Sequence, residues 1–296
     1  MSTNQKEGRR DVQNDLFNLS RVDRMWQIPT TSRAPNTWHI PKGTIIGLSS
    51  RNDEKIQTAR KAIENDYHGK IVKPAVGIPE RGIKEMLRIR WEIDNDMRGI
   101  RLFDARRVVK IAALKAFTFF KDETVTYGLG LDTDVFIMGP DEEGPLGMPK
   151  NREELYEMLE KISGKNIKIV SAGALVDFKK KRVVAIEALN IMLKLRDFKP
   201  EEFIEVFSDS TVGEIAGAID YSDFLSTQFL DEKAPVIINR IDQSNQEDDR
   251  FDQPEREVWL TPSEAPPILR ECVKGSPQLI KWLIYNGLTN PRIINL

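Results

Sequence analysis

The chain has 296 residues, of which 40% are hydrophobic, and at roughly 100–200 residues per domain this predicts one large domain with appendages. Lys and Arg total 44 against 46 Asp and Glu, a net charge of -2, which gives no overall attraction to nucleic acid or to an anionic membrane. A single cysteine, Cys272, excludes an internal disulfide, and two histidines, His39 and His68, argue against a histidine-based metal centre, so a metal would need oxygen ligands.

The chain begins with a polar segment, residues 1–40, that lacks sustained periodicity and is expected to be disordered or to dock onto the body. Because neither a signal peptide nor 18 uncharged apolar residues in a row can be found in the sequence, we expect a soluble, cytoplasmic protein without membrane contact. Gly43 to Leu48 then predicts a buried strand, followed by the polar turn Ser49 to Asn52 and a helix through Ile63.

The central part is expected to alternate between strands and helices. Residues 71–76 favour a second strand, and the polar stretch 79–104 is long enough for a helix with a loop. Apolar residues at three- and four-residue steps predict a helix over 105–120. It leads into the apolar strand 125–131.

The C-terminal half continues the alternation. Asn151 is expected to open a helix that stops near Ser163-Gly164, and a last helix holds Ile280 to Ile284. The remaining predictions are strands over 167–175 and 182–195 (the second equally a helix by propensity), a short helix from Lys199, and a polar stretch 242–252 outside the core. These elements predict an α/β fold with a mixed sheet.

Two side-chain constellations could handle phosphates. In the first, Ser50, Asn52 and Lys55 follow a strand and open a helix, so a hydroxyl, an amide and an ammonium can converge on an anion, with Arg51 adding charge. Ser and Asn are also ordinary helix caps, and Arg51 could simply face solvent.

In the second constellation, Asp132 and Asp134 lie where the apolar strand is expected to run out, and Lys115 lies on the preceding helix. Carboxylates at such a rim are candidate ligands for a hard cation or candidate bases, and the lysine could bind a phosphate beside them. The alternatives are a helix or turn cap for the aspartates and a surface position for the lysine.

Two further segments carry less chemical information. Ser163 to Gly173 is a helix stop followed by a strand, with Gly164 as a left-handed cap. The small residues of Glu214 to Ser222 permit close backbone approach, either to a base or ribose or to a neighbouring element.

In this order and spacing, the pieces from about Gly43 to Asp242 resemble the Maf family of nucleoside triphosphate pyrophosphatases within the inosine-triphosphatase-like superfamily. The most specific parts are Val109 to Ala116, Leu131-Asp132-Thr133, Pro149 to Gly164, and Ala216-Gly217. The Ser50-x-Asn52-x-x-Lys55 turn is more similar to the phosphate loop of the inosine-triphosphatase branch, so the chain looks like a divergent member.

The resemblance implies an elongated, twisted mixed sheet with flanking helices, two lobes around a central cleft, Mg²⁺ or Mn²⁺ as cofactor, and possible retention of the family's common homodimer. It implies hydrolysis of a non-standard or modified nucleoside triphosphate to monophosphate and pyrophosphate. Asp132 would hold metal or activate water and Lys115 would bind phosphate, while Ser50, Asn52 and Lys55 would cradle the triphosphate. The alternative is a catalytically weakened nucleotide-binding or regulatory protein on the same scaffold.

The sequence departs from the family pattern at identifiable positions. Met148-Pro149 stands where the family carries Lys-Pro, which makes Lys150 the candidate replacement. The family's base-contacting glutamine falls near Ser222, and Ile167 replaces a histidine. Among the upstream acids Glu92, Asp94 and Asp96, Glu92 is preferred as the residue that shares the metal.

Three segments are therefore predicted: an N-terminal arm, 1–40, a catalytic domain, 41–242, and an acidic loop with a C-terminal helical extension packed on that domain, 243–296.

Overall fold

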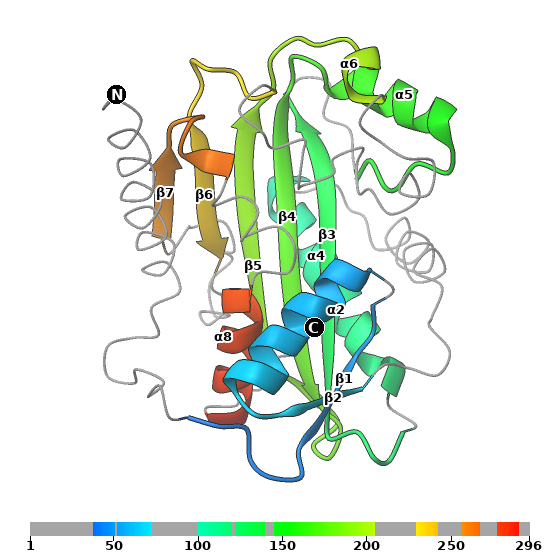
Figure 1. The fold of residues 1–296 in the computed structure, drawn as a ribbon, viewed down its shortest axis with the longest axis vertical. Coiled ribbons are helices and arrows are strands. Elements are labelled where there is room, and N and C mark those ends of the chain that lie inside the picture. Colours follow the sequence, from blue (N-terminus) through cyan, green and yellow to red (C-terminus); the bar gives the residue numbers. More distant parts are fainter. Residues whose placement is uncertain are drawn as a thin grey trace, which may run out of the picture.

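The computed structural model describes residues 38–50, 52–72, 100–119, 122–139, 145–204, 229–241, 256–266 and 277–289. Within them, a single seven-stranded sheet organises the molecule, with the strand order β2-β1-β3-β4-β5-β6-β7. In Figure 1, α2 and α8 cross one face of this sheet and α4 lies behind the other. The predicted fold class, a mixed sheet with flanking helices, is confirmed, whereas the two lobes and the cleft stay a prediction.

The elements follow one another as strands and helices. They are β1 (Ile45–Leu48), α2 (Asp53–Arg60), the π-helix η2 (Lys61–Asp66), β2 (Lys70–Val72), α4 (Ile100–Ala116), the 3₁₀-helix η3 (Phe117–Phe119), β3 (Tyr127–Met138), α5 (Arg152–Ile162), β4 (Asn166–Asp177), β5 (Arg182–Lys194), α6 (Glu201–Ile204), β6 (Val236–Ile241), β7 (Arg256–Leu260) and α8 (Pro277–Thr289).

The sheet is parallel on one side and antiparallel on the other. Strand β1 pairs in parallel with both β2 and β3, and α2 with η2 forms the crossover between β1 and β2. From β3 to β7 every neighbouring pair is antiparallel. The sequence predicted this mixture because helices separate the first strands, whereas a short hairpin turn joins β4 to β5 between Asp177 and Arg182.

The second run of the central hairpin is a strand, not a helix. Strand β5 pairs along most of its length with β4 and over its second half with β6. Its β-branched residues, such as Val183, Ile186 and Ile191, are buried between packed layers on both faces. Pairing on two edges outweighs the helix propensity of its Ala, Leu and Glu residues, so the strand alternative is the correct one.

Each face of the sheet carries its own core. One cluster joins the sheet to apolar residues of α2, α5 and α8, for example Ile56, Leu159 and Leu283. The other cluster joins the opposite face to α4 through Val108, Ala112 and their neighbours. Strand β3 and strand β4 thus lie between two packed layers, which explains why almost every residue of both is buried.

The ends of α5 are set by the residues that the sequence singled out. The Asn151 side chain accepts a hydrogen bond from the Glu154 backbone N–H at 2.9 Å and caps the helix. Gly164, just beyond the last turn, has a φ of +68°, the left-handed conformation expected of a C-terminal cap.

The residues assigned to a C-terminal extension contribute to the same sheet. Strand β7 pairs with β6, and α8 packs on β4 and β5. The boundaries of the predicted catalytic domain, 41–242, and of the two flanking segments stay predictions. Residues 1–37 of the predicted arm and all of 242–252 lie outside the described residues. No helix in the described part of the chain is long and apolar enough to cross a membrane.

Candidate functional site

The acidic pair Asp132 and Asp134 lies inside strand β3, not at its end. The strand runs to Met138, and Asp132 pairs with Ala172 while Asp134 pairs with Val170 of β4. Each aspartate is 1% exposed. The expectation of a strand exit and a rim was wrong because Val135, Phe136 and Ile137 continue the strand beyond the two acids. The cap and turn alternatives are excluded for the same reason.

Helix α4 lies directly on the backbone of β3 beside this pair. Because side chains alternate along a strand, Gly128, Gly130 and Asp132 share the face that α4 covers. A Cβ atom on Gly130 would lie 1.7 Å from the Ala112 carbonyl oxygen of α4, and one on Gly128 would lie 2.1 Å from the Ala116 carbonyl oxygen. The two glycines therefore permit a helix–strand approach that any side chain would block.

This close approach brings Lys115 onto Asp132. The Lys115 Nζ donates to Asp132 Oδ1 at 2.7 Å, and both residues are buried, with exposed fractions of 8% and 1%. The surface position considered for Lys115 was wrong. The second carboxylate oxygen, Oδ2, is buried and has no hydrogen-bond partner among the described residues. A buried carboxylate oxygen without a partner costs about 1–3 kcal/mol, and native proteins keep such atoms where a ligand, ion or water completes them.

The polar turn after β1 ends beside this part of β3. Strand β1 pairs with β3 only as far as Leu48 opposite Leu129, so Ser49 and the residues after it come level with Gly130 to Asp132. The chain runs from β1 outward to β2 and from β3 in the opposite direction to β4, and α/β proteins place their ligands at the carboxyl ends of strands at such a switch point.

Within the turn, side chains cap the following helix. Ser50 Oγ accepts from the Asn52 N–H at 3.2 Å, and Asn52 Oδ1 accepts from the Lys55 N–H at 3.0 Å. The capping interpretation of Asn52 is therefore confirmed. Phosphate binding by Ser50, Asn52 and Lys55 stays a prediction, and Arg51 lies outside the described residues.

Further along β3, residues 145–150 return to the strand. The Leu146 N–H donates to the Val135 carbonyl at 2.9 Å. Lys150 forms an ion pair with Glu154 at 2.5 Å, and its backbone N–H donates to the same carboxylate at 2.7 Å, so Lys150 is held by Glu154 and not by Asp132. Its side chain is 60% exposed.

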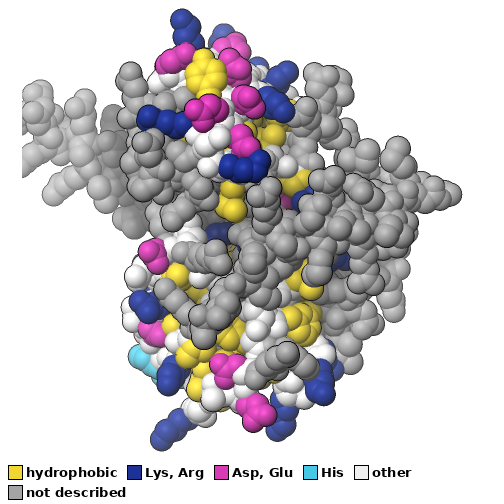
Figure 2. Space-filling model, turned by 90° about the vertical axis from the view of Figure 1, so that its right-hand side faces the viewer, with side chains coloured by type: hydrophobic (Ala, Val, Ile, Leu, Met, Phe, Trp, Pro, Cys, Tyr) yellow, Lys and Arg dark blue, Asp and Glu magenta, His cyan; other side chains and the backbone are white. Residues whose placement is uncertain are grey.

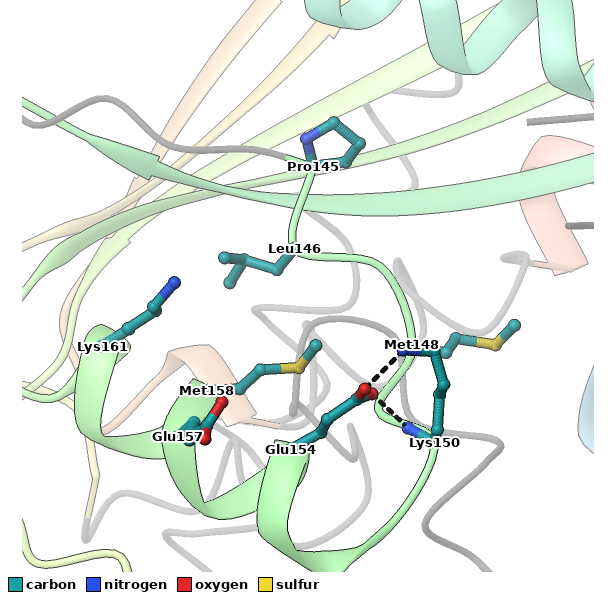
Figure 3. Close-up of a pocket in the computed structure, with 8 residues that line it drawn as sticks. All are labelled: Pro145, Leu146, Met148, Lys150, Glu154, Glu157, Met158 and Lys161. Carbon is teal, nitrogen blue, oxygen red and sulfur yellow. Dashed lines mark hydrogen bonds and ion pairs between the residues drawn. The ribbon is translucent and has the colours of Figure 1, made fainter. Parts of the chain in front are cut away.

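A cavity of about 570 Å³ opens between this segment and α5 (Figure 3). It is lined by Pro145, Leu146, Met148, Lys150, Glu154, Glu157, Met158 and Lys161.

The donor set around Asp132 suits a divalent cation that is shared with a substrate. Mg²⁺ in proteins takes one or two carboxylates and completes its shell with water and phosphate oxygens. Asp132 Oδ2 is one such oxygen, and Asp134 lies on the same face of β3. Among the described residues no three His, Cys, Asp or Glu side chains gather into a cage. Glu92, the predicted third ligand, lies outside them, as does Ser222.

Sequence reasoning missed two features of the site. The alternating Gly128 and Gly130 ahead of Asp132 mark a close helix contact, and their spacing in an apolar strand was a usable signal. Buried Thr133 and Ser171 share a hydrogen bond at 3.3 Å on the opposite face, which depends on strand register and had no local signal.

The chain was compared with known proteins. The family model described as "Maf-like protein" matches residues 81–234. Over 154 residues the chain is 27% identical to the dTTP/UTP pyrophosphatase of Clostridium acetobutylicum, a stretch that covers 51% of this chain and 69% of that protein. The family match includes Lys115, Asp132 and α5, and it begins after the β1 turn, so it does not bear on the role predicted for that turn.

Proposed function

The chain belongs to the Maf-like family, and on that premise we propose that it hydrolyses a nucleoside triphosphate to the monophosphate and pyrophosphate. The observation that carries the proposal is the buried Lys115–Asp132 pair, whose second carboxylate oxygen has no partner among the described residues. The similarity to a dTTP/UTP pyrophosphatase supports the same activity. The substrate could be one of these two nucleotides or a modified one.

In this proposal Asp132 is the central acid. Lys115 holds Oδ1, which fixes the orientation of the carboxylate, and Oδ2 is the atom left for the chemistry. There it accepts a proton from the water that attacks the α-phosphorus. The new bond joins the water oxygen to that phosphorus, the bond between the α-phosphorus and the oxygen that bridges to the β-phosphorus breaks, and pyrophosphate leaves with the electron pair.

Lys115 supplies positive charge beside the reacting phosphate. Its ammonium is fixed in a buried position by Asp132, so it offsets developing negative charge without reorganising. Asp132, with Asp134 and Glu92, would hold Mg²⁺ or Mn²⁺, which when bound neutralises phosphate charge and polarises the scissile bond. Lys150 and the residues Ser50 to Lys55 are assigned to the phosphates in the same proposal, and Ser222 to the base.

The test is pyrophosphate release from a panel of common and modified nucleoside triphosphates with Mg²⁺ or Mn²⁺. Asp132→Asn should lower kcat by at least about 10²-fold, as expected for loss of a general base. Asp177→Asn is the matched control because Asp177 is a buried aspartate of the same sheet that also pairs with a lysine, Lys180, away from the site. No release from any nucleotide by the wild-type protein would refute the proposal.

A second candidate function is nucleotide binding without turnover. It is favoured by one observation, the engagement of Lys150 with Glu154. Calorimetry that shows tight nucleotide binding together with no product would select it.

A further inference from the structure

The two histidines of the chain lie ring against ring at the molecular surface. His39 precedes β1 and His68 precedes β2, and their ring centroids are 4.6 Å apart with the ring planes tilted by 55°. Both side chains are exposed, and Figure 2 shows histidine, in cyan, at the surface in the lower part of the molecule. The sequence contains no other histidine. The fold therefore brings together two imidazoles that are far apart along the chain.

The backbone on each side of both histidines is held in place by its neighbours. The Ile40 N–H donates to the Tyr67 carbonyl at 2.9 Å, and the Trp38 ring meets the Tyr67 ring edge-on with a centroid distance of 4.9 Å. Gly69 lies against the same segment, since a Cβ atom on it would come within 2.5 Å of Ile40 Cδ1. The residues directly before and after each histidine thus hold the two main chains side by side, so little entropy is lost when both imidazoles bind one ligand.

The imidazole nitrogens are available to a ligand. Within the described part of the chain, neither histidine side chain forms a hydrogen bond or an ion pair, and the nearby Asp66 is engaged with Lys281. His68 has a φ of +53°, a left-handed conformation that costs free energy in residues with a side chain and that clusters at ligand sites. Neutral imidazole is the commonest metal ligand in proteins. No third His, Cys, Asp or Glu of the described residues joins the pair, so water would complete the shell of a bound ion.

The separation of the rings indicates which metal ions fit. An ion held at about 2.0–2.1 Å from an imidazole nitrogen lies about 3.2 Å from the ring centroid. Two centroids that are 4.6 Å apart therefore subtend an angle of about 90° at a shared ion. This is the cis angle of the square-planar and tetragonal geometries that Cu²⁺ and Ni²⁺ adopt with nitrogen and oxygen ligands, whereas tetrahedral Zn²⁺ needs about 109°.

We propose that His39 and His68 form a binding site for one Ni²⁺ or Cu²⁺ ion. Composition argued against a histidine-based centre because the chain has only two histidines, but a two-histidine chelate needs no more. The bound ion ties the segment before β1 to the segment before β2, and an ion that binds only the folded chain stabilises it. The site is separate from Asp132, because the turn that comes level with Asp132 follows the opposite end of β1.

The experiment measures Ni²⁺, Zn²⁺ and Mg²⁺ binding to the full chain by calorimetry at neutral pH, without nucleotide. The wild-type protein should bind one Ni²⁺, with Zn²⁺ weaker and Mg²⁺ not competing, since Mg²⁺ prefers oxygen ligands. His39→Gln and His68→Asn should each weaken Ni²⁺ binding at least about tenfold, because each removes one of two imidazoles. Asparagine is chosen at position 68 because it tolerates a positive φ. Ni²⁺ should also raise the urea midpoint of the wild-type protein and leave that of both variants unchanged.

Cys272→Ser is the control because Cys272 is the single thiol of the chain and the other side chain with a high affinity for such ions. It should bind Ni²⁺ as the wild-type protein does. The proposal is overturned if the wild-type protein binds no Ni²⁺, if either histidine variant binds Ni²⁺ as tightly as the wild-type protein, or if Zn²⁺ binds more tightly than Ni²⁺. None of these outcomes depends on the proposed hydrolysis, and His39→Gln should release pyrophosphate with Mg²⁺ as the wild-type protein does.

Discussion

Gly130 is the residue at which helix α4 lies closest to strand β3, and Gly130→Ala tests how the Lys115–Asp132 pair is built. A Cβ atom there would lie 1.7 Å from the Ala112 carbonyl oxygen and 2.7 Å from the Ala116 nitrogen. Since Cβ atoms are essentially never found within 3.0 Å of such atoms, the helix and the strand must separate by about 1.3 Å.

The size of the expected loss of stability follows from the rigidity of the α4 backbone, which the added Cβ atom would meet. Overpacking typically costs about 1–3 kcal/mol, and a helix backbone gives way less readily than a side chain, so we expect the upper part of that range. Alanine recovers about 0.5–1 kcal/mol because glycine is unfavourable inside a strand. The net loss of unfolding free energy should be about 2 kcal/mol. Because Lys115 moves with α4, a displacement of this size should also lower kcat about 10²-fold.

The assay is urea unfolding followed by circular dichroism, together with pyrophosphate release. Gly173→Ala is the control: its Cβ would crowd only two methyl tips, those of Leu283 at 2.5 Å and Leu131 at 3.1 Å, which can rotate aside, and it would meet the Gly130 carbonyl oxygen at an ordinary contact distance of 3.6 Å. It should cost less than about 1 kcal/mol and leave kcat unchanged. The reasoning would be refuted if Gly130→Ala were as stable and active as the wild-type protein, or if both substitutions had equal effects.

Four shorter predictions accompany this one. Lys115→Met should lower the free energy of unfolding, measured in urea, by about 3–5 kcal/mol because it leaves Asp132 buried and unpaired. The double variant Lys115→Met with Asp132→Leu should recover most of this loss, and no recovery would contradict the ion-pair account. Asn151→Ala should cost about 1 kcal/mol in the same assay, and an unchanged midpoint would exclude its role as the cap of α5. Burial first, and then the nearby Asp66, raises the pKa of Tyr67 to about 12. The folded protein therefore favours the neutral phenol, and the stabilisation that this preference gives is complete below pH 10 and is lost as the pH rises through 12. In thermal unfolding at pH 10–12, Tyr67→Phe should therefore resist alkali better than the wild-type protein, by about 1–2 kcal/mol after allowance for solvent screening, and equal loss in both proteins would refute this. Chelation with EDTA should abolish pyrophosphate release and added Mg²⁺ or Mn²⁺ should restore it, whereas activity that persists in EDTA would contradict the metal requirement.

Local sequence signals predicted the elements well wherever they were strong. The Asn151 cap and Gly164 predicted both ends of α5, and apolar residues at three- and four-residue steps predicted the helix that ends at Ala116. The sequence prediction ended β3 too early because two acidic residues in a strand usually indicate that the chain is exposed to solvent. Their burial depends on α4 and β4, which come from elsewhere in the chain and enclose the strand on its face and its edge.

Lys115, Asp132 and Asp134 were identified from the sequence as a group, and the resemblance to the Maf family, stated separately, is borne out by the family match. Residue type and order along the chain were sufficient for this, because helix α4 and strand β3 follow one another and pack as neighbours. The tertiary structure decided what the sequence left open: that Lys115 is buried on Asp132, that Lys150 is held by Glu154, and that Leu146 returns to Val135 beside a cavity. These are matters of register and of close approach between distant segments, since alternation along a strand says which residues share a face but not which helix covers it.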